Sequence, residues 1–170
     1  MARWQGDKVA RWYISQMTDS ISRRHLIGSA FAAAAGAFAL PSLLRASAGT
    51  PMMVYKDPNC GCCHNWVEIM RTAGFEVSIR DTRDMNSIKT RYKVRPALVS
   101  CHTALVGGYV VEGHVPADVI RKLLADKPKV LGIAVPGMPI GSPGMEGTPK
   151  QAYEVLTFDA AGKTTVFARR

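Results

Sequence analysis

The sequence has little cysteine, no internal repeat and no cluster of basic residues. Lys and Arg outnumber Asp and Glu by 22 to 13 in the 170 residues, but the basic residues are scattered along the chain. Nucleic-acid-binding proteins usually gather such residues on one face or along one helix. The scatter therefore argues against nucleic acid as a partner.

The chain also lacks an apolar run of the length that spans a bilayer. The uncharged, Ala-rich residues 27–44 are interrupted by Pro41, and a spanning helix needs about 20 apolar residues. Ser22-Arg23-Arg24-His25-Leu26-Ile27 resembles the twin-arginine export motif, and Ala46-Ser47-Ala48 fits a signal-peptidase site. We expect residues 1–48 to be a cleaved leader, with Met17 as an alternative start. A membrane anchor or a buried helix is the alternative.

This leader predicts a periplasmic protein that meets the membrane only during export. Residues 49–170 then form the mature protein, which is long enough for one compact domain with its own core.

The expected elements of residues 49–170 indicate an α/β fold. A strand over 52–55, a helix over about 63–73 and a strand over 75–80 make a βαβ unit. A short helix capped by Asp84 follows, then a strand over 97–101 paired with one over 104–113. A helix from about Pro116 and a terminal hairpin of 152–158 and 163–168 complete a small mixed sheet flanked by helices.

Residues 132–149 are dense in glycine and proline, which excludes a helix or a long strand. This loop carries Met138 and Met145, whose thioethers are soft metal ligands. The loop could fold both over a nearby site. Simple packing or solvent exposure of the two methionines is the equal alternative.

Three of the four cysteines, Cys60, Cys62 and Cys63, stand within four residues where the first strand gives way to the first helix. Cys60 and Cys63 have the Cys-x-x-Cys spacing, and a helix N-terminus lowers the pKa of a thiol. A thiol-disulfide or copper-redox enzyme, in which Cys60 attacks and Cys63 resolves, is therefore one hypothesis. Cys62 opposes it, because a third thiol competes for mixed disulfides.

Three convergent thiolates instead favour a soft metal ion, and Cu(I) is the soft ion that a bacterial envelope must handle. Structural zinc usually takes two separated cysteine pairs, which this spacing does not match. Two structural disulfides, in a domain that binds partners through its Gly/Pro loop, are a further alternative. Whether the protein turns over a substrate stays open at this point.

Other side chains near these thiols have weaker signals. His102 and His114 could ligate or orient a metal, although a single histidine is more often structural. We expect His64 to be exposed and Asp57 to hydrogen-bond the cysteine loop. Pro96 would match the cis-proline of thioredoxin-like folds, or else is an ordinary trans proline at a strand start.

Five segments together resemble one family. They are residues 57–63 (Asp-Pro-Asn-Cys-Gly-Cys-Cys), 100–104, 107–116 and the Gly/Pro segments 134–139 and 141–146. They are similar to the CopG-like periplasmic copper-resistance proteins of bacteria. The resemblance implies a thioredoxin-like fold and Cu(I) bound by Cys60, Cys62, Cys63 and Cys101. It also implies an oxidoreductase role in copper handling. We expect a periplasmic copper carrier or a redox partner.

Overall fold

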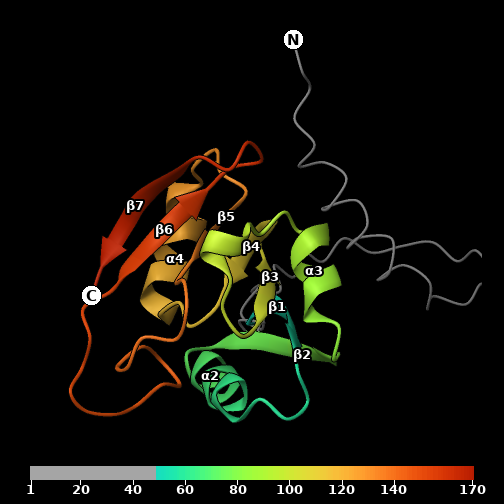
Figure 1. Ribbon diagram of the computed structural model, residues 1–170, viewed down its shortest axis with the longest axis vertical. Helices are drawn as coiled ribbons and strands as arrows, with labels where there is room; N and C mark the ends of the chain where they lie inside the picture. Colours follow the sequence, from blue (N-terminus) through green and yellow to red (C-terminus); the bar gives the residue numbers. More distant parts are fainter. Residues whose placement is uncertain (1–48) are drawn as a thin grey trace, which may run out of the picture. The chain divides into compact units, whose positions relative to one another are not determined.

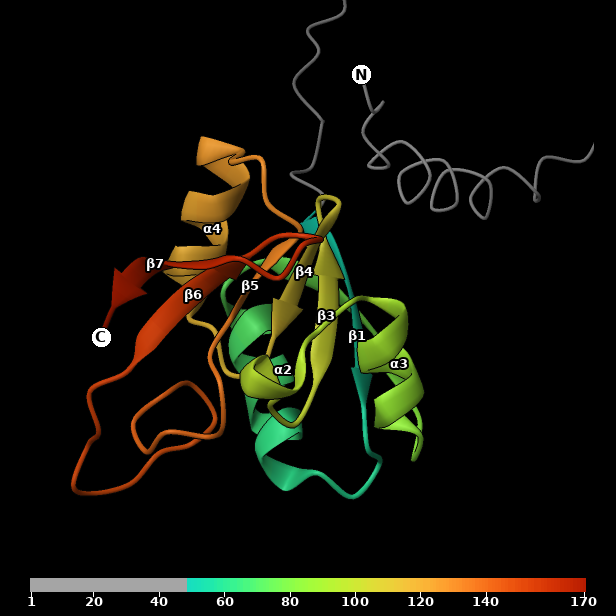
Figure 2. The same cartoon turned by 45° about the horizontal axis from the view of Figure 1, so that its top comes forward.

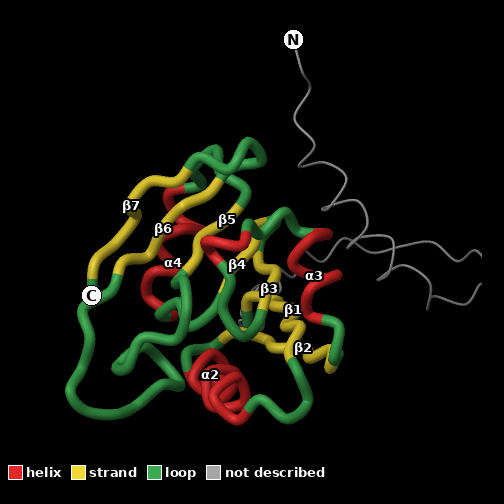
Figure 3. The backbone as a smooth tube through the Cα atoms, viewed as in Figure 1, coloured by secondary structure: helices red, strands yellow, loops and turns green. Residues whose placement is uncertain are grey.

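The computed structural model describes residues 49–170, in which seven strands form one mixed sheet and three α-helices pack on it (Figures 1 and 3). The strand order is β2-β1-β3-β4-β5-β6-β7. No helix within residues 49–170 is long and apolar enough to cross a membrane. The expected leader lies outside the described residues, so its export and cleavage stay predictions.

The first half of the domain is the predicted βαβ unit. Strand β1 (Thr50–Lys56) leads into helix α2 (Gly61–Thr72), and β2 (Phe75–Asp81) returns parallel to β1. The buried stripe of α2 is Cys63, Trp66, Val67 and Met70, as helical periodicity requires. Gly74, with a φ of 86°, supplies the left-handed residue that ends the helix.

The middle of the chain corrects one prediction. Helix α3 (Met85–Arg91) begins at Asp84, whose side chain accepts a hydrogen bond from Ser87 N as expected. The predicted strand over 97–101 is wrong, because a short 3₁₀ helix, η1 (Pro96–Leu98), occupies its start. Ser100 N donates to the Glu112 side chain at 2.8 Å and not to a neighbouring strand. The Glu112 side chain thus accepts the hydrogen bond that a neighbouring strand would have accepted from Ser100 N.

The segment predicted as one strand over 104–113 is itself a hairpin. It consists of β3 (Thr103–Val106) and β4 (Tyr109–Glu112), joined by Gly107 and Gly108 with φ values of 55° and 86°. Two successive positive φ angles are what a tight two-residue hairpin turn needs, and glycine adopts them without strain. The two glycines therefore form a tight turn inside the segment that was predicted as one strand.

The second half extends the sheet. Helix α4 (Ala117–Asp126) is followed by β5 (Gly132–Ala134), which lies parallel to β4. A Cβ on Gly132 would lie 2.1 Å from Val110 O, so only glycine fits that register. Strands β6 (Glu154–Phe158) and β7 (Thr164–Arg169) form the predicted terminal hairpin.

The helices lie on both faces of the sheet (Figure 2). The larger apolar cluster joins α2 and α4 to one face of the central strands and includes Met52, Trp66 and Ile120. The smaller cluster lies on the other face and includes Val94, Leu98 and Phe158. Together with the central strand order β2-β1-β3-β4, this arrangement confirms the thioredoxin-like mixed α/β fold.

Candidate metal centre

The Cys-x-Cys-Cys segment lies where β1 ends and α2 begins. Cys60 is the N-cap residue of α2, and Cys62 and Cys63 lie in its first turn. Asp57 shapes the preceding turn, because its carbonyl accepts from Cys60 N at 3.1 Å and its Oδ1 accepts from Asn59 N at 2.8 Å. The predicted hydrogen-bonding role of Asp57 is therefore confirmed. His64, also in the first turn, is exposed as expected.

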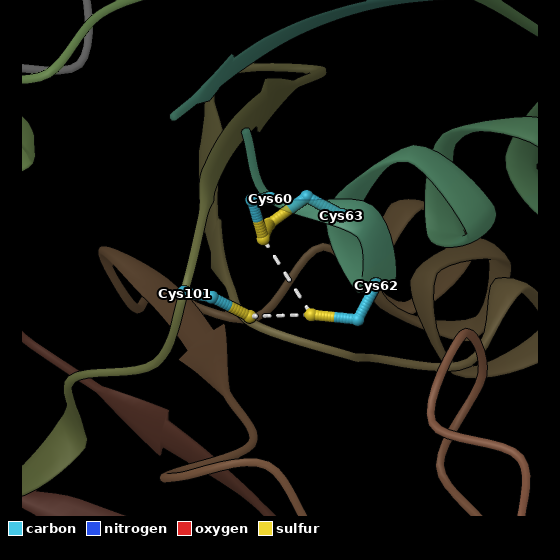
Figure 4. Close-up of side chains that lie close together, drawn as sticks. All are labelled: Cys60, Cys62, Cys63 and Cys101. Atoms are coloured by element: carbon cyan, nitrogen blue, oxygen red, sulfur yellow. Dashed lines mark hydrogen bonds between the residues drawn. A yellow bond between two sulfur atoms is a disulfide. The ribbon is translucent and has the colours of Figure 1, made fainter. Parts of the chain in front are cut away.

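The four cysteines come together, although Cys101 is distant in sequence (Figure 4). Cys60 and Cys63 form a disulfide, and Cys62 and Cys101 are free thiols. Cys62 Sγ lies 3.5 Å from Cys60 Sγ and 3.8 Å from Cys101 Sγ. All four sulfur atoms lie within 4.8 Å of one another. In the described residues there is one disulfide and not the two of the structural alternative.

Cys101 is held by a buried polar network behind its loop. Glu112 is fully buried, and its carboxylate accepts from Lys89 Nζ at 2.5 Å, from Ser100 N at 2.8 Å and from Thr103 Oγ1 at 2.7 Å. Burial raises the pKa of Glu112, and the Lys89 ammonium opposes that shift. The network fixes the backbone on both sides of Cys101.

Two glycines let neighbouring backbone approach the thiols closely. A Cβ on Gly113 would lie 2.4 Å from Ser100 Cβ, and one on Gly144 would lie 2.7 Å from Cys62 O. Both residues have positive φ angles, 73° and 83°. The Gly/Pro loop therefore packs its backbone against the start of α2 through Gly144.

His114 is a site residue that the sequence had left undecided. Its Nδ1 lies 2.7 Å from Pro143 O, a pure acceptor, so Nδ1 carries the proton. Its Nε2 therefore presents a lone pair to Cys101 Sγ, 2.7 Å away. Burial lowers the pKa of His114 and keeps the imidazole neutral. The Cys101 thiol donates to this nitrogen.

His102 lies beside the same thiol in a more enclosed position. Its Nδ1 is 4.0 Å from Cys101 Sγ, and its ring packs on Trp66 with 4.3 Å between centroids. His102 is fully buried, and its Nε2 has no hydrogen-bond partner among the described residues. Burial lowers the pKa of His102 well below its ordinary value. Cys101, His102 and His114 thus form a second group of three potential ligands.

The remaining candidates lie outside this geometry or stay untested. Met138 is 51% exposed and Met145 is half-buried, so a thioether role for either stays a prediction. Among the described residues the cis peptide bond is at Thr148–Pro149 and not before Pro96. Pro96 is therefore an ordinary trans proline and not the cis-proline of thioredoxin-like folds.

The donor set determines which metals the site fits. Once the Cys60–Cys63 disulfide is reduced, four thiol sulfurs lie beside two imidazoles, and sulfur ligands favour Cu(I) over the oxygen-seeking ions. Burial, with the neighbouring Cys62 as the next cause, raises the pKa of Cys101 to about 12. Cys101 is thus a thiol when metal-free, and a bound ion would have to displace its proton.

Comparisons with known proteins agree with this geometry. A family model described as "Protein of unknown function, DUF411" matches residues 98–145, which include Cys101 and both buried histidines. No curated protein matches the chain. Two solved structures, entitled copper resistance protein CopG, forms 1 and 2, each share 41% identity with it and superpose with a TM-score of 0.68.

Each alignment covers 72% of this chain and 98% of the solved chain, so the likeness extends over almost the whole of that protein. At this identity and coverage the relationship includes the fold. The chain belongs to the CopG family of copper resistance proteins.

Proposed function

We propose that this protein is a periplasmic Cu(I)-binding protein of copper resistance, which holds copper through Cys60, Cys62, Cys63 and Cys101. The observation that carries the proposal is the convergence of four sulfur atoms within 4.8 Å, supplied by two segments far apart in sequence. Thiolates are the ligands that soft Cu(I) prefers. The copper-resistance title of the two solved relatives supports the same ion.

Copper binding through all four sulfurs requires reduction of the protein. The Cys60–Cys63 disulfide leaves Cys62 and Cys101 as the two free thiols. Two electrons and two protons convert the disulfide into two further thiols, which then lose protons to the incoming metal. We therefore expect the reduced protein to bind Cu(I) much more tightly than the oxidised protein.

The disulfide also favours a second candidate function. A Cys-x-x-Cys disulfide at a helix N-terminus is the arrangement of thiol-disulfide oxidoreductases, and here Cys60 is the N-cap residue of α2. In that case Cys60 and Cys63 exchange electrons with a thiol substrate or with copper. Replacing Cys62 by Ser distinguishes the two functions, because a plain dithiol enzyme keeps its turnover and a four-thiolate copper site loses affinity.

X-ray absorption at the copper edge tests the proposed ligands. Protein reduced and loaded with Cu(I) without oxygen should give a first shell dominated by sulfur. Protein with its disulfide intact is the matched control and should take up less copper. A first shell of oxygen and nitrogen alone, or equal loading of the two forms, would contradict the proposal.

The periplasmic location and a copper carrier or redox partner belong to the same proposal. They rest on the twin-arginine motif and the Ala46-Ser47-Ala48 sequence, which lie outside the described residues. Cell fractionation tests the location. Recovery of the full-length chain in the cytoplasm, unchanged when Arg23 and Arg24 are both replaced by Lys, would contradict it.

A further inference from the structure

A free thiol contacts the disulfide of this site. Cys62 Sγ lies 3.5 Å from Cys60 Sγ, which is bonded to Cys63 Sγ (Figure 4). Thiol-disulfide exchange begins when a thiolate reaches a disulfide sulfur, and this separation is close to contact between two sulfur atoms. The attacking group and its target are therefore already neighbours.

A second free thiol continues the same path. Cys101 Sγ lies 3.8 Å from Cys62 Sγ, and both lie within 4.8 Å of the disulfide sulfurs (Figure 4). Its sulfur is held in place by His114, whose Nε2 lies 2.7 Å away and whose opposite ring nitrogen donates to Pro143 O. The three sulfurs of Cys60, Cys62 and Cys101 thus form a series in which each contacts the next.

We propose that the disulfide moves within the chain, between the pair Cys60–Cys63 and the pair Cys62–Cys101. This activity does not depend on copper. It gives Cys62 and Cys101 a role as a second redox pair, in addition to the Cys-x-x-Cys pair.

Two exchange steps accomplish the movement. The Cys62 thiolate attacks Cys60 Sγ, which forms a Cys60–Cys62 bond and releases Cys63 as a thiolate that takes up a proton. Cys101, after giving up its proton to solvent, then attacks Cys62 Sγ as a thiolate. The Cys62–Cys101 bond forms, and Cys60 leaves as a thiolate that takes up a proton from solvent.

The electron balance closes without an external reagent. One disulfide and two thiols are present before and after the two steps, so neither an oxidant nor a reductant is consumed. A single two-electron oxidation is thereby shared by four cysteines and is not fixed in one pair. Reduction of either disulfide restores all four thiols.

Disulfide mapping of the metal-free full chain tests the proposal. The oxidised protein is held at about pH 8.5, near the ordinary pKa of cysteine, so that thiolate is present. At intervals it is quenched with acid, its free thiols are alkylated, and the disulfides are located by proteolysis and mass spectrometry. We expect Cys62–Cys101 to appear beside Cys60–Cys63 in a ratio that becomes constant and does not depend on protein concentration.

The Cys62→Ser variant is the matched control. It lacks the intermediate sulfur, so it should retain only Cys60–Cys63, with Cys101 alkylated throughout. Wild-type protein that keeps Cys60–Cys63 as its single disulfide for a day would overturn the proposal. A Cys101 disulfide formed equally fast in the Cys62→Ser variant would overturn the path through Cys62. Because copper is absent throughout, neither result bears on metal binding.

Discussion

Removing the Glu112 carboxylate should destabilise the fold behind the metal site. Glu112 accepts three hydrogen bonds, one of them from the buried Lys89 ammonium. In the Glu112→Ala variant this ammonium keeps its hydrogen bond to Thr103 Oγ1 at 3.3 Å but loses the opposite charge beside it. Deleting one partner of a buried ion pair costs about 3–5 kcal/mol, because the other charge stays buried. The free energy of unfolding should fall by that amount.

The measurement is urea unfolding of the reduced, metal-free protein, followed by circular dichroism. Asp126→Ala is the matched control, because Asp126 pairs with Lys122 at 2.6 Å and the two side chains are 43% and 54% exposed. Exposed pairs contribute about 1 kcal/mol or less. The double variant Lys89→Met with Glu112→Leu removes both charges together, so it should cost less than the sum of its two single variants.

Two results would refute this reasoning. The first is a Glu112→Ala variant that costs no more than Asp126→Ala, which would mean that water reaches the network. The second is a double variant that costs the full sum of the single variants. The Lys89 and Glu112 charges would then not be coupled.

Two further predictions concern the loop and the imidazoles. Gly144→Ala should destabilise the protein by about 1–3 kcal/mol in urea unfolding, because the residue has a φ of 83° and its new Cβ would lie 2.7 Å from Cys62 O. Gly61→Ala is the control and should be nearly neutral, because no atom lies within 4 Å of its new Cβ. Acid should also destabilise the protein, because the pKa of His102 lies well below 6.5 in the fold. Below about pH 6.5 the unfolded chain binds a proton that the folded chain does not, so stability falls by up to about 1.4 kcal/mol per pH unit until the folded pKa is reached. His102→Leu should flatten this slope in unfolding curves at several pH values, and an unchanged slope would contradict the account of His102. A costly Gly61→Ala variant would contradict the account of Gly144.

Local patterns made much of the fold predictable. The βαβ unit followed from helical periodicity between two extended runs, and the cysteines at its turn placed the thiols at a helix N-terminus. The terminal hairpin followed from turn residues between alternating segments. Each of these signals lies within a few residues of the element that it predicts.

The strand over 97–101 was mispredicted because its outcome depends on a distant residue. The fully buried carboxylate of Glu112 takes the Ser100 amide that a strand would have used, and nothing near Ser100 in the sequence signals this. The contact between Cys101 and His114 had a signal that was not used. With the turn placed at Gly107 and Gly108, Thr103 pairs with Glu112, and the same register continued by two residues sets Cys101 opposite His114.

The central claim is that four thiolates from two segments hold Cu(I). The most direct test is an anaerobic Cu(I) titration of the fully reduced protein against a competing chelator, with the Cys62→Ser and Cys101→Ser variants alongside. The account predicts tight binding by the wild-type protein and a large loss of affinity in both variants. Weak binding, or binding that neither substitution changes, would contradict it.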